Sequence, residues 1–414
     1  MTCKNCKSTK LDKVVKLGKQ PLSGFFYKKK NLKLPKYSLD LFQCRDCGLV
    51  QIINQFSIKK MYGKHYGYET SKSSLMINHL KEKVSRFKKK GYLKKKNSVL
   101  DIGSNDGTFL NLIGKSFKRY GVDPSGTKFK KNYKKIKLIN EFFSKKKIKP
   151  RDTKFDLITS FAIFYDVEDP NQFCADIKSI LKPNGIWACE LSYLPLMLKN
   201  LTFDQICHEH VTYYSLKVFE KIINQNGLKL LDVKLNEING GSIEIICSHD
   251  DSKRNVNYNL IKDLKNDENK ITKTSFFNFN KRIFKIKKDL RNFLINKKNV
   301  FAYGASTKGN VVLNLCNLSS KELEFVCDAN RKKYGSFTPG SNIEIISKEK
   351  MRKIFPKYLL VLIWSFRKEV IKQEKEYVKS GGNLIFHLPK FHIINKKNYR
   401  SYLNKSFNDM SYKY

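Results

Sequence analysis

The sequence has no long run of apolar residues and contains few arginines. None of its apolar stretches approaches the roughly 20 residues that a helix needs to cross a bilayer, and residues 1–4 begin without the apolar segment of a secretory signal. Of the 82 basic residues only 11 are arginine, the side chain best suited to bidentate recognition of bases and phosphates. We therefore expect a cytoplasmic protein that binds neither a membrane nor nucleic acid.

Lysine dominates the charge of this chain. The lysines are spread along the sequence and bring the formal net charge to +45. Because they do not gather in one block, most of this charge describes a solvated surface, together with an attraction for an anionic substrate. The length of 414 residues exceeds one typical domain and indicates two or three compact units.

Four of the ten cysteines form two Cys-x-x-Cys pairs, at Cys3 and Cys6 and at Cys44 and Cys47. Each pair presents two thiolates from one tight turn, and four thiolates complete a tetrahedral site for a structural Zn²⁺. The alternative is that they are small buried apolar side chains, and disulfides are disfavoured in a reducing compartment. The remaining cysteines lack ligand spacing and indicate core packing: Cys174, Cys189, Cys207, Cys247, Cys316 and Cys327.

A glycine loop joins a buried strand to a helix within residues 99–110. Its acids, Asp101 and Asp106, stand where a dinucleotide site would offer free N–H groups to a pyrophosphate, so a positively charged cofactor without phosphate fits better. The next strand ends within residues 120–125 at Asp123, which can accept hydrogen bonds from both ribose hydroxyls. Together these features predict S-adenosylmethionine (SAM), and the alternative is an ordinary tight turn.

The apolar pattern predicts an α/β protein with two sheets. A helix at 73–90 precedes four strands that alternate with helices, at 98–103, 119–123, 155–160 and 185–191. Such alternation is typical of a parallel sheet covered on both faces. Apolar residues at helical spacing within 252–299 indicate one or two connecting helices, and further strands follow at 325–328, 358–362 and 383–386.

These elements predict five segments. They are a zinc-binding domain at 1–60, a SAM-binding domain with a helical lead-in at 61–250, connecting helices at 251–299, a second Rossmann-like domain at 300–395 and a frayed polar tail at 396–414.

The second domain opens with another strand and glycine turn, at residues 300–310. Here the turn offers hydroxyls, a lysine and free N–H groups in Ser306, Thr307 and Lys308, a combination suited to an anion. The alternative is an ordinary strand-to-helix turn. A third glycine turn, Asn239 to Ser242, brings backbone against a substrate or forms a hairpin.

Residues 203–215 concentrate two imidazoles, two carboxylates and two phenols between the two α/β units. Histidine has the unperturbed pKa best suited to proton abstraction near neutrality, and an adjacent carboxylate can orient it or bind a substrate hydroxyl. This density favours acid–base chemistry over a structural cluster. The spacing of His208 and His210 is poor for zinc.

The order of these motifs resembles the sugar-nucleotide C-methyltransferases over nearly the whole chain. The resemblance rests on the two Cys-x-x-Cys pairs, Tyr66-Gly67-Tyr68, the loop at 101–107, Cys207-His208-Glu209-His210, Asn239-Gly240-Gly241-Ser242 and Tyr303-Gly304-Ala305-Ser306-Thr307-Lys308. It implies a zinc-binding domain, a SAM-binding Rossmann-like domain and a C-terminal Rossmann-like domain. It also implies methylation of a carbon next to the keto group of a nucleotide-activated deoxysugar, by a monomer that serves polysaccharide biosynthesis.

The resemblance also implies roles for individual residues. His210 becomes the base, Glu209 holds the sugar, and Tyr68 reaches in from the linker. The remaining roles are SAM binding by Asp101, Gly103, Asn105, Asp123 and Phe143, and substrate binding by Asn239, Ser306, Thr307 and Lys308, the last three at the nucleotide diphosphate.

Three positions depart from the pattern of the resemblance. Cys207 stands where members acting on the best-known deoxysugars have tyrosine, and Tyr165, which we count among the catalytic candidates, stands where they have histidine. Glu244 occupies a position where arginine is common. The alternatives that stay open are O- or N-methylation of a sugar nucleotide, a zinc-ribbon RNA methyltransferase and a scaffold without activity.

Overall fold

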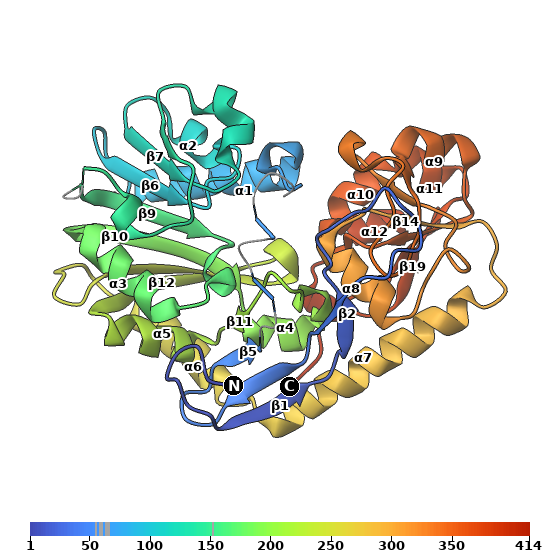
Figure 1. The fold of residues 1–414 in the computed structure, drawn as a ribbon, viewed down its shortest axis with the longest axis horizontal. Coiled ribbons are helices and arrows are strands. Elements are labelled where there is room, and N and C mark those ends of the chain that lie inside the picture. Colours follow the sequence, from blue (N-terminus) through green and yellow to red (C-terminus); the bar gives the residue numbers. More distant parts are fainter. Residues whose placement is uncertain (54–55, 58–60, 63–66, 151–152) are drawn as a thin grey trace.

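Two α/β units stand side by side on a small N-terminal unit in the computed structural model (Figure 1). The structure describes residues 1–53, 56–57, 61–62, 67–150 and 153–414. The N-terminal chain runs beneath both units, and the C-terminus lies close to β1 in the same view (Figure 1). The predicted mixed α/β architecture with two Rossmann-like sheets is confirmed.

The first unit contains a seven-stranded sheet in the order β12-β13-β10-β9-β6-β7-β8. Its strands are β6 (Ser98–Ile102), β7 (Lys118–Val122), β8 (Lys137–Ile139), β9 (Phe155–Phe161), β10 (Leu181–Ser192), β12 (Leu228–Asn236) and β13 (Ser242–His249). All adjacent pairs are parallel except the two that involve β13. The four strands predicted to form a parallel sheet correspond to β6, β7, β9 and β10, and they pair in parallel. The turn at residues 237–241 joins β12 to β13 in a hairpin, one of the two roles expected for it.

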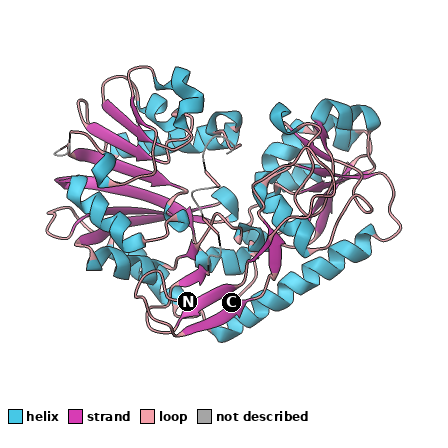
Figure 2. Ribbon diagram, viewed as in Figure 1, coloured by secondary structure: helices cyan, strands magenta, loops and turns pink. Residues whose placement is uncertain are grey.

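Helices cover both faces of this sheet and lead to the second unit (Figure 2). They are α1 (Ser74–Lys89), α2 (Thr108–Ile113), α3 (Pro170–Ile180), α4 (Leu194–Asn200), α5 (Leu216–Gln225), α6 (Tyr258–Glu268) and α7 (Lys273–Leu294). Helix α3 begins where Asp169 accepts a bond from Gln172 N and Pro170 supplies its fixed φ at the first turn. Among the described residues, no helix combines the length and apolarity required to cross a bilayer.

The second unit contains a six-stranded sheet in the order β16-β15-β14-β17-β18-β19. Its strands are β14 (Val300–Tyr303), β15 (Val326–Asp328), β16 (Ile345–Ser347), β17 (Tyr358–Val361), β18 (Asn383–Phe386) and β19 (His392–Ile394). Its helices are α8 (Thr307–Leu315), α9 (Lys348–Ile354), α10 (Arg367–Gln373), α11 (Lys375–Lys379) and α12 (Tyr399–Asn404). Only β19 is antiparallel to its neighbour.

The N-terminal unit shares a sheet with the segment that carries the histidines. Strands β1 (Leu11–Val15), β4 (Leu41–Cys44) and β5 (Val50–Ile52) continue into β11 (Thr212–Tyr213). A separate hairpin is formed by β2 (Lys19–Pro21) and β3 (Lys36–Ser38). Because β11 begins two residues after His210, the N-terminal sheet fixes the backbone next to the candidate catalytic segment.

The expectation of a frayed tail after Asn395 is wrong. Arg367 donates to the carbonyl of Lys405 at 2.6 Å, and the amide of Tyr412 donates to Lys199 O at 2.7 Å. Phe407 is buried against Trp364, with ring centroids 5.0 Å apart. The tail is therefore fixed by apolar burial and by backbone hydrogen bonds that its polar composition does not reveal.

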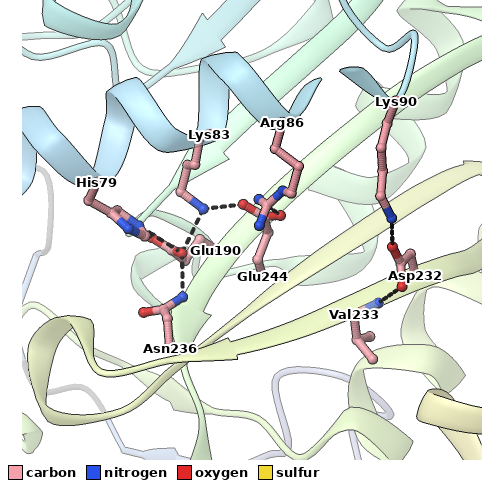
Figure 3. A network of polar contacts seen from close by, with 9 residues as sticks. All are labelled: His79, Lys83, Arg86, Lys90, Glu190, Asp232, Val233, Asn236 and Glu244. Atoms are coloured by element: carbon pink, nitrogen blue, oxygen red, sulfur yellow. Dashed lines mark hydrogen bonds and ion pairs between the residues drawn. The ribbon is translucent and has the colours of Figure 1, made fainter. Parts of the chain in front are cut away.

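Helix α1 is fixed to the seven-stranded sheet by a buried ionic network (Figure 3). Glu190 and Glu244 are paired neighbours on β10 and β13. Lys83 bonds to both, at 2.7 Å to Glu190, while His79 bonds to Glu190 at 2.8 Å and Arg86 pairs with Glu244. Burial acts to raise the pKa of Glu190, but the charge of Lys83 and the bond from His79 lower it to about 2.

We expect Glu244→Ala to lower the free energy of unfolding by about 3 kcal/mol. The substitution leaves the buried Lys83 ammonium with one carboxylate and Arg86 without its partner. Chemical denaturation measures the change. The more exposed Lys90–Asp232 pair serves as control, since Asp232→Ala should cost less than about 1 kcal/mol. Equal losses in the two variants would contradict the importance of burial.

Candidate active site

The four predicted zinc ligands converge at one point. The sulfur atoms of Cys3, Cys6, Cys44 and Cys47 all lie within 4.8 Å of one another, with the Cys3–Cys47 and Cys6–Cys44 pairs at 3.5 Å. Four thiolates leave no open coordination position, so the donor set fits a structural Zn²⁺. Asn171 donates to the Asn5 carbonyl beside them at 3.0 Å, which joins this turn to the first α/β unit.

A cavity of about 330 Å³ opens at the carboxyl ends of β6 and β7. The predicted SAM residues Asp101, Gly103, Asn105, Asp123 and Phe143 all line it. The size is within the range of small-molecule pockets, and the lining combines apolar side chains with a few polar groups. These residues fit SAM, with aromatic surface for the adenine and carboxylates for the ribose and the charged methionine end.

Asp123 holds the glycine loop and keeps acceptor capacity towards the cavity. Its Oδ2 accepts from Asn105 N at 2.8 Å, and its Oδ1 accepts from the amide and hydroxyl of Ser125 at 2.7 and 2.6 Å. A carboxylate offers about four lone pairs, so Oδ2 has an acceptor position left for a ribose hydroxyl.

Gly103 stands at the end of β6 with φ 72°, in the left-handed region. A Cβ there would lie 2.2 Å from Ile163 Cδ1, so a side chain cannot be accommodated. Beside it, Asp101 accepts from Thr159 Oγ1 at 2.6 Å, and burial raises the pKa of Asp101 to about 7.

Tyr68 lines the same cavity from the segment before α1. Its carbonyl accepts from Asn105 Nδ2 at 3.1 Å, and its side chain is 42% exposed. Tyr66, which contributed to the resemblance, lies outside the described residues.

His210 lies at the end of a buried polar segment and presents one free ring nitrogen. Its Nδ1 donates to the carbonyl of Gln205 at 2.8 Å, and its Nε2 forms no hydrogen bond to any residue that the structure describes. Burial and the charge of Lys308 lower the pKa of His210 to about 3, although the bond to Gln205 acts to raise it. The imidazole is therefore neutral, with Nε2 ready to accept a proton.

Two aromatic side chains fix His210. The ring of Tyr165 lies 4.2 Å from the imidazole, between centroids, and Tyr213 donates to the His210 carbonyl at 3.0 Å. Tyr165 is itself held by its backbone carbonyl, which accepts from Val211 N at 2.8 Å. The structure thus brings together two of the predicted catalytic residues.

Glu209 faces the N-terminal unit and the second α/β unit at once. A Cβ built on Gly24 would lie 2.6 Å from Glu209 Oε1, and 3.7 Å from Thr307 Oγ1. Burial raises the pKa of Glu209 to about 7, while bonds from Cys207 and Thr307 act in the opposite direction. This carboxyl group can therefore either accept from or donate to a substrate hydroxyl near neutral pH.

The second α/β unit contributes Lys308 to this cluster. Its Nζ donates to Asn239 Oδ1 at 3.0 Å, and Asn239 also lines the SAM cavity. Ser306 caps α8 by accepting from Gly309 N at 3.0 Å. Residues from both units, predicted separately from three motifs, therefore meet at Asn239. The described residues that line the cavity all precede the second unit, and His210, Glu209, Tyr165 and Lys308 are not among them.

Three family models match successive parts of the chain. A zinc-binding domain matches residues 3–62, a methyltransferase domain matches 74–233, and a C-methyltransferase C-terminal domain matches 237–389. The C-methyltransferase NovU from Streptomyces niveus is 28% identical over 369 residues, which cover 86% of this chain and 88% of NovU. The chain is therefore similar to C-methyltransferases over most of its length. It is a SAM-dependent methyltransferase with a structural zinc site.

Solved methyltransferases are similar to part of this methyltransferase. A SAM-dependent methyltransferase from Clostridium acetobutylicum is 16% identical with a TM-score of 0.33, covering 41% of this chain and 91% of that one. The PH0226 protein from Pyrococcus horikoshii is 17% identical with a TM-score of 0.35, covering 44% of this chain and all of that one.

Some residues of the site were absent from the sequence-based expectations. Asp166 accepts from Tyr62 at 2.7 Å, and Asp204 accepts from Trp364 Nε1 at 2.8 Å. Asp166 directly follows Tyr165, and Asp204 lies in the polar segment that the sequence singled out. Both acids lie next to residues that the sequence analysis singled out. Their hydrogen-bond partners, Tyr62 and Trp364, lie more than 100 positions away in the sequence.

We expect one tightly held Zn²⁺ per chain, and Cys44→Ser should abolish this stoichiometry. A serine hydroxyl is a poor ligand for zinc, and the remaining three thiolates leave an open position. Metal analysis of the purified protein measures the content. Cys316→Ser, in the second unit, is the matched control and should retain zinc; equal zinc content in the two variants would contradict the assignment.

Asp123→Ala should weaken SAM binding by roughly 1.5–3 kcal/mol, the scale for losing a charged hydrogen-bond acceptor. Calorimetry measures the affinity, and circular dichroism verifies that the fold persists. Asp289→Ala, on the far helix α7, is the control and should leave SAM affinity unchanged. Unchanged affinity in Asp123→Ala would show that this carboxylate does not contact the cofactor.

Proposed function

We propose that this methyltransferase methylates a carbon next to the keto group of a nucleotide-activated deoxysugar. The observation that carries the proposal is the neutral His210, whose free Nε2 stands in the cluster that joins the SAM-binding unit to the second unit. A hydroxyl or amine acceptor can react with little activation, whereas a carbon next to a ketone becomes nucleophilic only after a base removes its proton.

His210 acts as the base in this mechanism. Its Nε2 takes the proton from the carbon, and the electron pair of the broken C–H bond remains on the substrate as an enolate. The hydrogen bond from Nδ1 to Gln205 O fixes the tautomer before and after the transfer. Although the resting pKa of His210 is about 3, the enolate that forms beside the imidazolium stabilises the protonated ring during the step.

The other residues orient the two reactants. Glu209 binds a sugar hydroxyl, and Tyr165 holds the imidazole plane through ring contact. Bound SAM would supply an electrophilic methyl group to the enolate carbon. Asp101, Asn105 and Asp123 would hold the cofactor close to the substrate, and this proximity would supply further acceleration.

The second unit and the N-terminal unit supply the space for a large, anionic substrate. Ser306 and Thr307 stand at the first turn of α8, where backbone N–H groups favour negative charge. Gly24 leaves room beside the Glu209 carboxyl group, since a Cβ there would lie 2.6 Å from Glu209 Oε1. We assign the nucleotide diphosphate to this side of the cluster.

His210→Ala should bind SAM and sugar nucleotide almost normally, yet lose roughly 10²–10⁴ in turnover, the range of a positioned acid–base group. It should also fail to exchange the proton next to the ketone with deuterated water when SAM is absent, because exchange needs only the base. Labelled SAM with a panel of 4-keto sugar nucleotides measures turnover, and NMR measures exchange.

His249→Ala, at the C-terminal end of β13 and outside the His210 cluster, is the matched control. It should retain both methyl transfer and proton exchange. Wild-type turnover in His210→Ala, with loss of exchange in Tyr165→Phe, would place the base at Tyr165. Turnover of a hydroxyl or amine acceptor but of no keto sugar would favour O- or N-methylation, and steeply salt-dependent RNA binding would favour an RNA substrate.

A further inference from the structure

Lys308 lies among three carboxyl groups without forming an ion pair to any of them in the described part of the chain. Asp204, Asp166 and Glu209 are its acidic electrostatic neighbours. Its one hydrogen bond goes instead to the neutral amide of Asn239, at 3.0 Å. An ammonium carries three N–H donors, so two of them are left for a bound molecule.

The neighbouring acids are occupied or resist ionisation. Asp204 accepts from Trp364, and burial raises the pKa of Asp204 to about 6 and that of Glu209 to about 7. Burial likewise raises the pKa of Asp166 well above its ordinary value. The cation is therefore only partly neutralised by its surroundings, and its positive charge is available to a substrate.

The position of Lys308 suits a single oxygen better than a diphosphate. The ammonium lies among buried groups, where a group that carries two full negative charges loses far more hydration than a ketone oxygen, which is neutral when it binds. The oxygen gains charge only as the proton leaves the neighbouring carbon. A fixed cation at that place stabilises the transition state more than the ground state.

We infer that Lys308 binds the ketone oxygen of the substrate and stabilises the enolate that His210 generates. This inference rests on the proposed function and replaces the expected role of Lys308 at the diphosphate, which stays with Ser306 and Thr307. The C–H electron pair moves towards the carbonyl carbon, the C=O electrons move onto the oxygen, and Lys308 donates a hydrogen bond to that oxygen without giving up its proton. Asn239 positions the ammonium.

The same cation acts on the base. Together with burial, the charge of Lys308 lowers the pKa of His210, which keeps Nε2 free before the substrate binds. The other described groups in contact with His210 are the Tyr165 ring and the Tyr213 hydroxyl, which donates to the His210 carbonyl. One residue therefore keeps the base unprotonated and also receives the product of deprotonation.

Lys308→Met should reduce kcat and the rate of deuterium exchange by about 10²–10³-fold, the loss seen when one donor to a developing oxyanion is removed. The KM for a 4-keto sugar nucleotide and the Kd values for dTDP, UDP and SAM should change less than threefold. Lys308→Arg, which keeps the charge, should recover part of the exchange. Lys298→Met, an exposed lysine before β14, is the matched control and should behave as wild type.

The opposite pattern would overturn the inference. If Lys308→Met raises KM and weakens dTDP and UDP binding more than tenfold while kcat is unchanged, Lys308 contacts the diphosphate. Lys308→Gln, similar in polarity but neutral, replaces the methionine variant if that one does not fold. A wild-type enzyme that neither exchanges nor methylates any keto sugar would instead refute the proposed function.

A measurement without substrate tests the role of Lys308 separately from the proposed function. NMR titration of the His210 ring in the free enzyme should show a higher pKa in Lys308→Met than in wild type, and a wild-type pKa in Lys308→Arg. An unchanged His210 pKa in Lys308→Met would show that this ammonium does not act on the base. That result would contradict the inference whichever substrate the enzyme uses.

Discussion

The contact between the turn at residues 239–241 and Trp364 sets the distance between the two α/β units, and the site depends on that distance. A Cβ at Gly240 would lie 2.5 Å from the Trp364 ring, so only glycine allows this approach. The same indole donates to Asp204, and Asn239 on the turn accepts from Lys308. One close contact therefore aligns groups from the two units.

Burial of this junction determines its electrostatics. Carboxyl groups lose hydration there, so the pKa values of Asp204 and Glu209 rise, while that of His210 falls. The cluster thus contains weakly ionised acids, a neutral imidazole and one ammonium. Such an environment suits a reaction that creates an anion transiently, because fixed dipoles and charges act strongly where water is excluded.

Glu244, which stands where the resembling family commonly has arginine, has a structural role in the ionic network of α1. This carboxylate joins Lys83 and Arg86 in the network that fixes α1 to the sheet. Helix α1 also contributes His79 to the SAM cavity. An acid at this position therefore stabilises a wall of the cofactor pocket, and its effect on substrate contacts is indirect.

Local sequence determined the parts of this protein whose chemistry is complete within a few residues. The Cys-x-x-Cys pairs, the loop after β6 and the strand that ends at Asp123 were recognisable because spacing alone places their ligands and backbone groups. The same reasoning predicted most of the strands and helices, because the spacing of apolar residues along a segment shows which of its faces is buried. Pairs far apart in the sequence, such as Asp204 with Trp364, Tyr62 with Asp166 and Lys308 with Asn239, were not predictable, because no local pattern encodes them. Only the tertiary structure decided that the C-terminal tail packs and that Lys308 lies beside Asn239 and Asp204, since each depends on which surfaces exclude water together.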